Sequence, residues 1–137
     1  MKIIVDAFGG DNAPLEVIKG SRMAVDELGY EIVLVGNEKI IKDEAEKNNI
    51  SLSGITIVHA PDVISMDDEP MDVMKSKSNS SMSKGLQLLA LGEGDAFVSA
   101  GNSGALAVGA TLKVKRIKGI KRCAFAPVIP KDKGFFM

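Results

Sequence analysis

The chain alternates short apolar runs with longer stretches in which apolar residues recur at every third or fourth position. Continuous apolar runs rich in β-branched residues predict strands buried on both faces, at residues 2–6, 32–35, 55–58 and 95–100. Helical spacing predicts amphipathic helices over residues 14–28, 38–47, 81–91 and 105–112. We expect Asp11 or Asn12 to cap the first of these helices and Gly29 to end it, and Ser80 or Ser81 to cap the third. Strands that alternate with helices predict an α/β fold with a doubly wound, mostly parallel sheet and right-handed crossovers.

The pattern changes after residue 112. Residues 113–122 contain six basic side chains and no acidic one. Residues 123–129 predict a fifth strand, and its prolines Pro127 and Pro130 indicate an edge position. Residues 134–137 have the pattern of another apolar strand that is just beginning. We therefore expect residues 1–137 to form the N-terminal part of a single α/β domain that is truncated at its C-terminus.

Composition narrows the class of protein. The chain of 137 residues is long enough for one domain with its own core. Its 17 basic and 18 acidic residues give a net charge of −1, which argues against a nucleic-acid partner. A single cysteine forms no internal disulfide, and no apolar run approaches the length of a membrane span. These features predict a soluble, cytoplasmic protein.

Two glycine loops follow predicted strands directly. The first contains Gly9, Gly10, Asp11 and Asn12, and the second is the stretch Ser99-Ala100-Gly101-Asn102-Ser103-Gly104-Ala105. Glycines at a strand-to-helix junction let the backbone approach a ligand, and the free N–H groups of the helix start attract anions. An ordinary turn with Asn or Ser as helix cap is the alternative. Neither loop matches a dinucleotide or P-loop pattern, so the sequence favours phosphate or a small phosphorylated group.

Other candidate chemistry is sparse. The chain has one histidine and one cysteine, and neither has a partner carboxylate at a suggestive spacing, so covalent catalysis has no candidate residues. We expect His59 to be structural or capping and Cys123 to be buried. Asp67, Asp68 and Glu69 fit a solvated acidic turn better than a metal site. Lys75, Lys77, Ser80 and Ser81 are either contacts for an anion or part of a solvated loop.

Six segments together resemble one family, and they occur in order along the whole chain. They are VDAFGGDNAP at 5–14, HA at 59–60, DEP at 68–70, NSSM at 79–82, SAGNSGA at 99–105 and RIKGI at 116–120. In these segments the chain resembles the phosphate acyltransferases of the PlsX family. Enzymes of this family make acyl phosphate from acyl-acyl-carrier protein and inorganic phosphate at the start of bacterial phospholipid synthesis.

The resemblance implies a three-layer α/β/α sandwich similar to phosphotransacetylases and to isocitrate and isopropylmalate dehydrogenases. It also implies direct attack of phosphate on a thioester, which needs no protein nucleophile, metal or cofactor. Asn102 and Ser103 would act as catalytic donors. The further phosphate or substrate contacts would be Gly9, Gly10, Asn12, Gly101, Gly104, Lys77, Ser80 and Ser81. Asp6 and Asp11 would order the first loop, because a carboxylate repels an anion.

The basic run has a separate implied role. Its residues Lys115, Arg116, Lys118, Lys121 and Arg122 would contact the acidic carrier protein, although a solvated helix end is the simpler reading of the residues alone. The resemblance further implies a homodimer of the full-length protein, with peripheral membrane contact through a later part of the chain.

The chain also departs from the family pattern. Phe8, Ser103 and Cys123 stand where the family usually has Met, Thr and Pro, and Ser76 and Ser78 stand where basic residues are common. Family members are also much longer. Two alternative functions therefore stay open, a phosphotransacetylase-like transferase that uses acyl-CoA and an inactive phosphate-binding fragment.

Overall fold

A parallel sheet of four strands organises the computed structural model, which describes residues 1–132 and 134–136. Its strands lie in the order β3-β2-β1-β4. Their bounds are Lys2–Asp6 (β1), Glu31–Gly36 (β2), Ile55–His59 (β3) and Ala96–Val98 (β4). The fold class expected from the sequence, a doubly wound parallel sheet, is confirmed.

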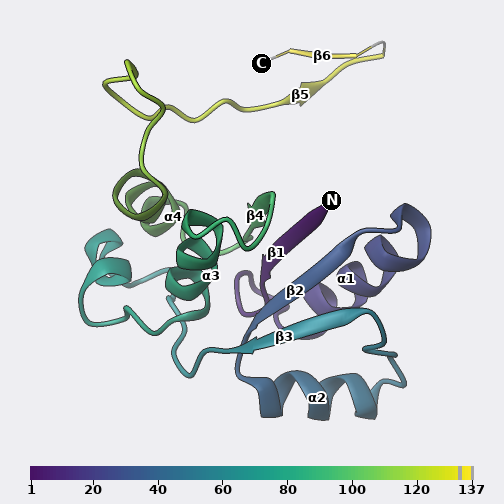
Figure 1. Ribbon diagram of the computed structural model, residues 1–137. Coiled ribbons are helices and arrows are strands. Elements are labelled where there is room, and N and C mark those ends of the chain that lie inside the picture. The colour runs from purple at the N-terminus through teal and green to yellow at the C-terminus, as the bar shows by residue number, and fades with distance from the viewer. Residues whose placement is uncertain (133, 137) are drawn as a thin grey trace.

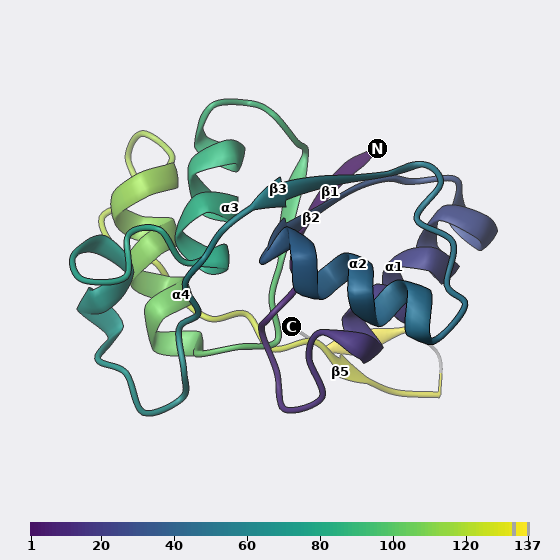
Figure 2. The ribbon, with the colours of Figure 1, turned by 90° about the horizontal axis from the view of Figure 1, so that it is seen from below.

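Helices cover both faces of this sheet (Figures 1 and 2). Helices α1 (Leu15–Leu28) and α2 (Glu38–Lys47) lie on one face, and α3 (Ser81–Ala90) lies on the other. Helix α4 (Ser103–Gly109) and the short 3₁₀ helix η1 (Pro70–Met74) pack together and against α3. A π-helical turn, η2 (Ala110–Val114), continues α4. The sheet is therefore the middle layer of an α/β sandwich.

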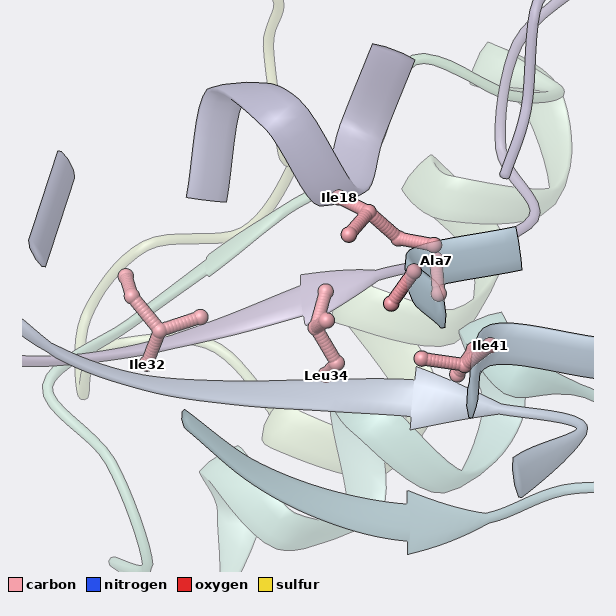
Figure 3. Packing of buried hydrophobic residues seen from close by; sticks show 6 residues of the cluster. Ala7, Ile18, Ile32, Leu34 and Ile41 are labelled. Atoms are coloured by element: carbon pink, nitrogen blue, oxygen red, sulfur yellow. The ribbon is translucent and has the colours of Figure 1, made fainter. Parts of the chain in front are cut away.

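The alternation of side chains along β2 explains why both faces are apolar. Ile32 and Leu34 join Ile18 of α1 and Ile41 of α2 in one cluster, which Figure 3 shows from close by. The intervening residues of β2 point to the opposite face and pack towards α3. A strand buried on both sides needs a continuous apolar run, and that run is what the sequence supplies.

Capping residues lie at the ends of several helices as expected, with one exception. Ser80 caps α3 by accepting a hydrogen bond from the Ser83 N–H, and Gly29 ends α1 in the left-handed conformation with φ of 65°. His59 also has the predicted capping role, since its Nδ1 accepts from the Glu38 N–H at 3.3 Å. The expected cap of α1 at Asp11 or Asn12 is wrong. Pro14 occupies that position without any side-chain cap.

The predicted fifth strand at residues 123–129 is also wrong. Only Ile129–Pro130 (β5) is a strand, and it pairs antiparallel with Phe135–Phe136 (β6) in a separate hairpin. Cys123 is exposed rather than buried. The predicted apolar strand at 134–137 corresponds to β6, except for Met137, which lies outside the described residues. Residues 115–132 are exposed and extend away from the sandwich (Figure 1), and no strand of the four-stranded sheet pairs with this segment.

Within the described residues, no helix is long and apolar enough to cross a membrane.

Candidate functional site

The chain reverses its winding direction between β1 and β4. These two strands are parallel neighbours, yet α1, which follows β1, lies on one face and α3, which precedes β4, lies on the other. Open α/β sheets bind ligands in the crevice at the carboxyl ends of the strands at such a point. The two predicted glycine loops follow β1 and β4, so the fold brings both of them to this crevice.

The two loops touch each other through glycines. A Cβ atom on Gly9 would lie 2.6 Å from the Ser99 Oγ and 2.9 Å from the Gly101 nitrogen, so a larger residue does not fit. Gly10 has φ of 109°, a conformation that side chains disfavour. The two loops therefore pack directly against each other, Gly9 beside Gly101 and Gly10 beside Ala100.

A short hydrogen-bond chain joins the loops. The Gly101 N–H donates to the Ser99 Oγ at 3.1 Å, and the Ser99 hydroxyl donates to Asp6 Oδ2 at 2.8 Å. The other carboxylate oxygen of Asp6 accepts from the Phe8 N–H at 3.2 Å. Asp6 is 3% exposed and orders the loop, as predicted. Sequence reasoning did not assign a role to Ser99. The signal that identifies it is a hydroxyl placed directly after β4.

Asn102 holds the start of α4 to the loop formed by residues 62–69. Its Oδ1 accepts from the Ala105 N–H at 3.0 Å, which caps α4. Its Nδ2 donates to the carbonyls of Ser65 at 3.1 Å and Asp68 at 3.2 Å. Asn102 is 7% exposed. Its amide is thus engaged by the protein itself, and its role as a donor to phosphate stays a prediction.

The neighbours of Asn102 are more accessible. Ser103 is exposed at the first turn of α4. Pro70 lies against Gly104, where an added Cβ would be 3.0 Å from the Pro70 Cγ. Among the described residues, the backbone N–H groups of Ser103 and Gly104 have no hydrogen-bond partner. These two groups are among the donors that the second loop leaves available.

Lys77 forms an ion pair with Asp68 beside the same loop. The Lys77 Nζ lies 2.5 Å from Asp68 Oδ2 and also donates to the Val63 carbonyl at 3.0 Å. The hydrogen bond from Lys77, together with one from the Ser65 N–H, lowers the pKa of Asp68 from 3.8 to about 2. The positive charge of Lys77, which the sequence offered to an anion, is therefore paired with Asp68 in this structure.

Ser80 and Ser81 lie buried at the start of α3. Ser80 is fully buried, and its Oγ is occupied by the cap of α3. Ser81 is 1% exposed, and its Oγ has no hydrogen-bond partner. Buried hydroxyls are normally paired, so the Ser81 hydroxyl at the start of α3 is a donor that remains available. Met82 reaches within 3.4 Å of the Cβ position of Gly101, which places this helix start near the second loop.

The remaining predicted residues do not join these groups. Asn12 is exposed at the outer end of the first loop. The basic residues Lys115, Arg116, Lys118, Lys121 and Arg122 are exposed after η2, beyond the carboxyl end of α4. Residues 103–114 separate them from the loops by roughly 15 Å of helix. Within residues 1–132 and 134–136, no group of three or more His, Cys, Asp or Glu side chains is arranged to hold a metal.

The fold and the paired loops define the class: a doubly wound α/β protein whose two glycine loops meet at the switch point of its sheet. A family model described as "Fatty acid synthesis protein" matches residues 1–137, and the chain belongs to this family.

Several similar proteins are named phosphate acyltransferase. The one from Thermoanaerobacterium thermosaccharolyticum is 47% identical over 134 residues, which cover 98% of this chain and 39% of that protein. The one from Clostridium novyi is 44% identical over 138 residues, covering 100% of this chain and 42% of that protein. The one from Thermotoga maritima is 45% identical and is covered to 38%. The chain therefore spans about two fifths of the length of these relatives.

Proposed function

We propose that this chain is the N-terminal part of a phosphate acyltransferase that forms acyl phosphate from an acyl-acyl-carrier-protein thioester and inorganic phosphate. The observation that carries the proposal is the backbone contact between the two glycine loops at the switch point. It occurs in a chain that is 42–47% identical to proteins named phosphate acyltransferase. Because the chain spans only part of these relatives, the activity is proposed for the whole gene product.

The proposed reaction needs positioned donors rather than a nucleophilic side chain. A phosphate oxygen attacks the thioester carbonyl, an oxygen–carbon bond forms, and the carbon–sulfur bond breaks. The carrier leaves as its thiol after it takes up a proton. The free N–H groups of Ser103 and Gly104 and the unpaired Ser81 hydroxyl are suited to hold the attacking anion or the developing oxyanion.

Asn102 and Lys77 fit the proposal as residues that position the loops. Both bind the 62–69 loop in this structure, so a direct contact with substrate requires that these bonds rearrange. Ser80 is committed to the cap of α3 in the same way. We therefore assign the proposed phosphate contacts first to Ser103, Gly104 and Ser81.

The exposed basic run is the proposed docking surface for the acidic carrier protein. The basic side chains lie away from the two glycine loops. They are therefore better placed to contact a large acidic partner than the phosphate itself. A homodimer and peripheral membrane contact of the whole protein remain predictions from the family resemblance.

The first experiment measures acyl phosphate formation by the whole gene product with acyl-carrier protein and with acyl-CoA as donors. Trapping with hydroxylamine identifies the product. We expect Ser103→Ala to raise the KM for phosphate by roughly tenfold, the effect of losing one hydrogen bond to a charged group. Ser53→Ala, on the exposed surface before β3, is the control and should change nothing. Unchanged phosphate kinetics in Ser103→Ala would exclude the Ser103 hydroxyl as a phosphate contact, since the substitution leaves the backbone N–H of this position in place.

The second experiment tests the docking surface and the alternatives. Reversal of charge at Arg116 and Lys118 to Glu should raise the KM for acyl-carrier protein at low salt and leave acyl-CoA kinetics unchanged. Lys39→Glu on the exposed side of α2 is the matched control. A preference for acyl-CoA would favour a phosphotransacetylase-like enzyme. Phosphate binding without any acyl phosphate would favour a binding module.

A further inference from the structure

Strand β4 is an edge strand of the sheet, and its outer side carries unused backbone groups. On one side β4 pairs with β1, and within residues 1–132 and 134–136 no strand pairs with its other side. The Asp95 N–H donates to the Lys2 carbonyl of β1 at 2.8 Å. Because successive N–H groups of a strand point in opposite directions, those of Ala96 and Val98 point to the free edge.

This edge has none of the features that usually keep an edge strand from pairing. Natural edge strands are protected by charged side chains, proline or a bulge. The three residues of β4 are apolar, and they pair with β1 in an unbroken register. Val98 is 52% exposed on the α1 side, whereas Ile4 at the centre of the sheet is fully buried. An exposed apolar edge of this kind indicates a partner strand.

The winding of the chain gives the direction in which the sheet grows. Crossovers between parallel strands are right-handed, so helices on opposite faces carry the chain in opposite directions along the sheet. Helices α1 and α2 carry it from β1 out to β3, and α3 on the other face carries it back to β4. Helix α4 follows β4 and packs with α3. A further crossover on this face therefore leads past the free edge of β4.

The relatives contain enough polypeptide to supply the strand. The matched part is 39% of the length of one phosphate acyltransferase and 42% of another, so about three fifths of each lies outside it. Residues 115–132 are exposed and do not pair with β4. The partner strand is therefore expected from the polypeptide that follows residue 137.

We propose that the part of the whole gene product that follows residue 137 adds an apolar strand to the free edge of β4. The inference rests on the proposed function only in that both take this chain as part of a longer protein. The added strand is apolar because its two faces continue those of Phe97, on the α3 side, and Val98, on the α1 side. Since β4 leads directly into Ser99 and Ala100, the added strand also reaches the second glycine loop. The site at the switch point is thus incomplete without it.

Amide hydrogen exchange in the whole gene product, resolved residue by residue by NMR, tests the pairing. The matched control is Phe97, whose N–H points to β1 and is slow to exchange whether or not β4 has a second partner. We expect the Ala96 and Val98 amides to exchange within about tenfold of the Phe97 rate, because a partner strand accepts their hydrogen bonds. Exchange of both amides by more than this factor faster than Phe97 would overturn the inference.

A photo-crosslinker identifies the partner. With p-benzoylphenylalanine incorporated at position 98, we expect a crosslink within one molecule to a peptide that follows residue 137. A crosslink to residues 115–137, a crosslink to a second copy, which doubles the mass on a denaturing gel, or no crosslink would each overturn the inference. The probe at Met23, which is 56% exposed on α1 outside the groove beside β4, is the matched control. The same crosslinked peptide from both positions would also overturn it.

Neither measurement depends on acyl phosphate formation. If the whole gene product forms no acyl phosphate, the proposed function fails, and slow exchange with the expected crosslink would still support the added strand. If the enzyme is active and the Ala96 and Val98 amides exchange fast, only the inference about β4 fails.

Discussion

The two faces of the sheet carry helices of similar length, but only one face is tightly closed. On the α3 side, an added Cβ at Gly85 would overlap the Phe97 ring of β4, and one at Gly109 would overlap Leu86. Glycine on that side lets the helix and the sheet approach until no space remains. On the α1 side, Gly20 faces open space instead. The same residue type therefore closes one interface and lies exposed beside the other.

The difference shows that a glycine on a helix does not by itself determine how closely the helix packs against the sheet. Its effect depends on whether a large side chain from another element fills the space beside it. Phe97 and Leu86 do so on the α3 side, whereas the side of α1 towards β4 has no such partner among the described residues. Substitutions at matched positions on the two faces test this explanation.

The largest expected effect is a leucine truncation on the closed face. Leu86 is 2% exposed, and Leu86→Ala should lower the free energy of unfolding by about 2–5 kcal/mol, because it leaves a cavity in a packed interface. Leu28→Ala on the open face should cost less than about 1 kcal/mol, since Leu28 is 60% exposed. Urea denaturation measures both. Similar losses at the two positions would contradict the difference between the faces.

An added methyl group on the closed face should also destabilise the protein. Gly85→Ala forces its Cβ against Phe97 and should lower the free energy of unfolding by about 1–3 kcal/mol, although alanine favours the helix. A second change, Phe97→Leu, makes room and should restore part of the loss. If Gly85→Ala alone is as stable as the wild type, α3 is free to move away from β4.

A smaller loss of stability is expected at Asn102, which hydrogen-bonds the 62–69 loop to the start of α4. Asn102→Ala removes the α4 cap and the bonds to the Ser65 and Asp68 carbonyls, which should cost about 1–2 kcal/mol. Asn102→Asp keeps the capping oxygen but loses the donors. It should therefore retain the helix while the loop becomes more sensitive to proteolysis. Equal protease resistance in the wild type and both variants would show that the Asn102 hydrogen bonds do not hold the 62–69 loop in place.

The open face should respond to an added methyl group in the opposite direction. Gly20→Ala should raise the free energy of unfolding by about 0.5–1 kcal/mol, because alanine favours the helix and its methyl group meets nothing. Thermal unfolding of this variant beside Gly85→Ala gives the direct comparison. A loss of stability at Gly20 would mean that the space is filled in the folded protein.

The smallest expected effect is the acid dependence of the Lys77–Asp68 ion pair. The pKa of Asp68 is lowered to about 2 from 3.8, so the pair stabilises the fold above the higher value and loses this contribution as the pH falls towards the lower one. Partly exposed pairs are weak, which places this effect last. Unfolding measured between pH 5 and roughly pH 2 should show the difference between wild type and Asp68→Asn shrinking. A difference independent of pH would exclude the ion pair as its source.

The apolar pattern predicted the first four strands and the helices well, because buried strands and amphipathic helices need these residues locally. It failed at residues 123–129, where the apolar segment pairs with no strand of the four-stranded sheet and only Ile129 pairs, with Phe136 in the separate hairpin. Strand formation depends on a partner, and the sequence of one segment does not contain that information. The cap of α1 failed for a similar local reason, since Pro14 occupies the position expected for a polar side chain.

The candidate site could be predicted only in part. Gly9, Gly10 and Gly101 were identified from the sequence because glycine after a buried strand indicates a tight backbone turn. Ser99 was missed, and the bonds of Asn102 and Lys77 to the 62–69 loop were not foreseen. These contacts join residues more than 30 positions apart or across a loop, and no periodic pattern encodes them.

By itself, then, the sequence determined the alternation of strands and helices, the two glycine loops and the family. Each of these depends on local residue preferences or on residues read in order along the chain. Tertiary structure alone decided that the loops meet at the switch point, that the Asn102 amide is hydrogen-bonded within the protein and that the space beside Gly20 of α1 stays open. These outcomes depend on the strand order, β3-β2-β1-β4, which places the distant β1 and β4 side by side.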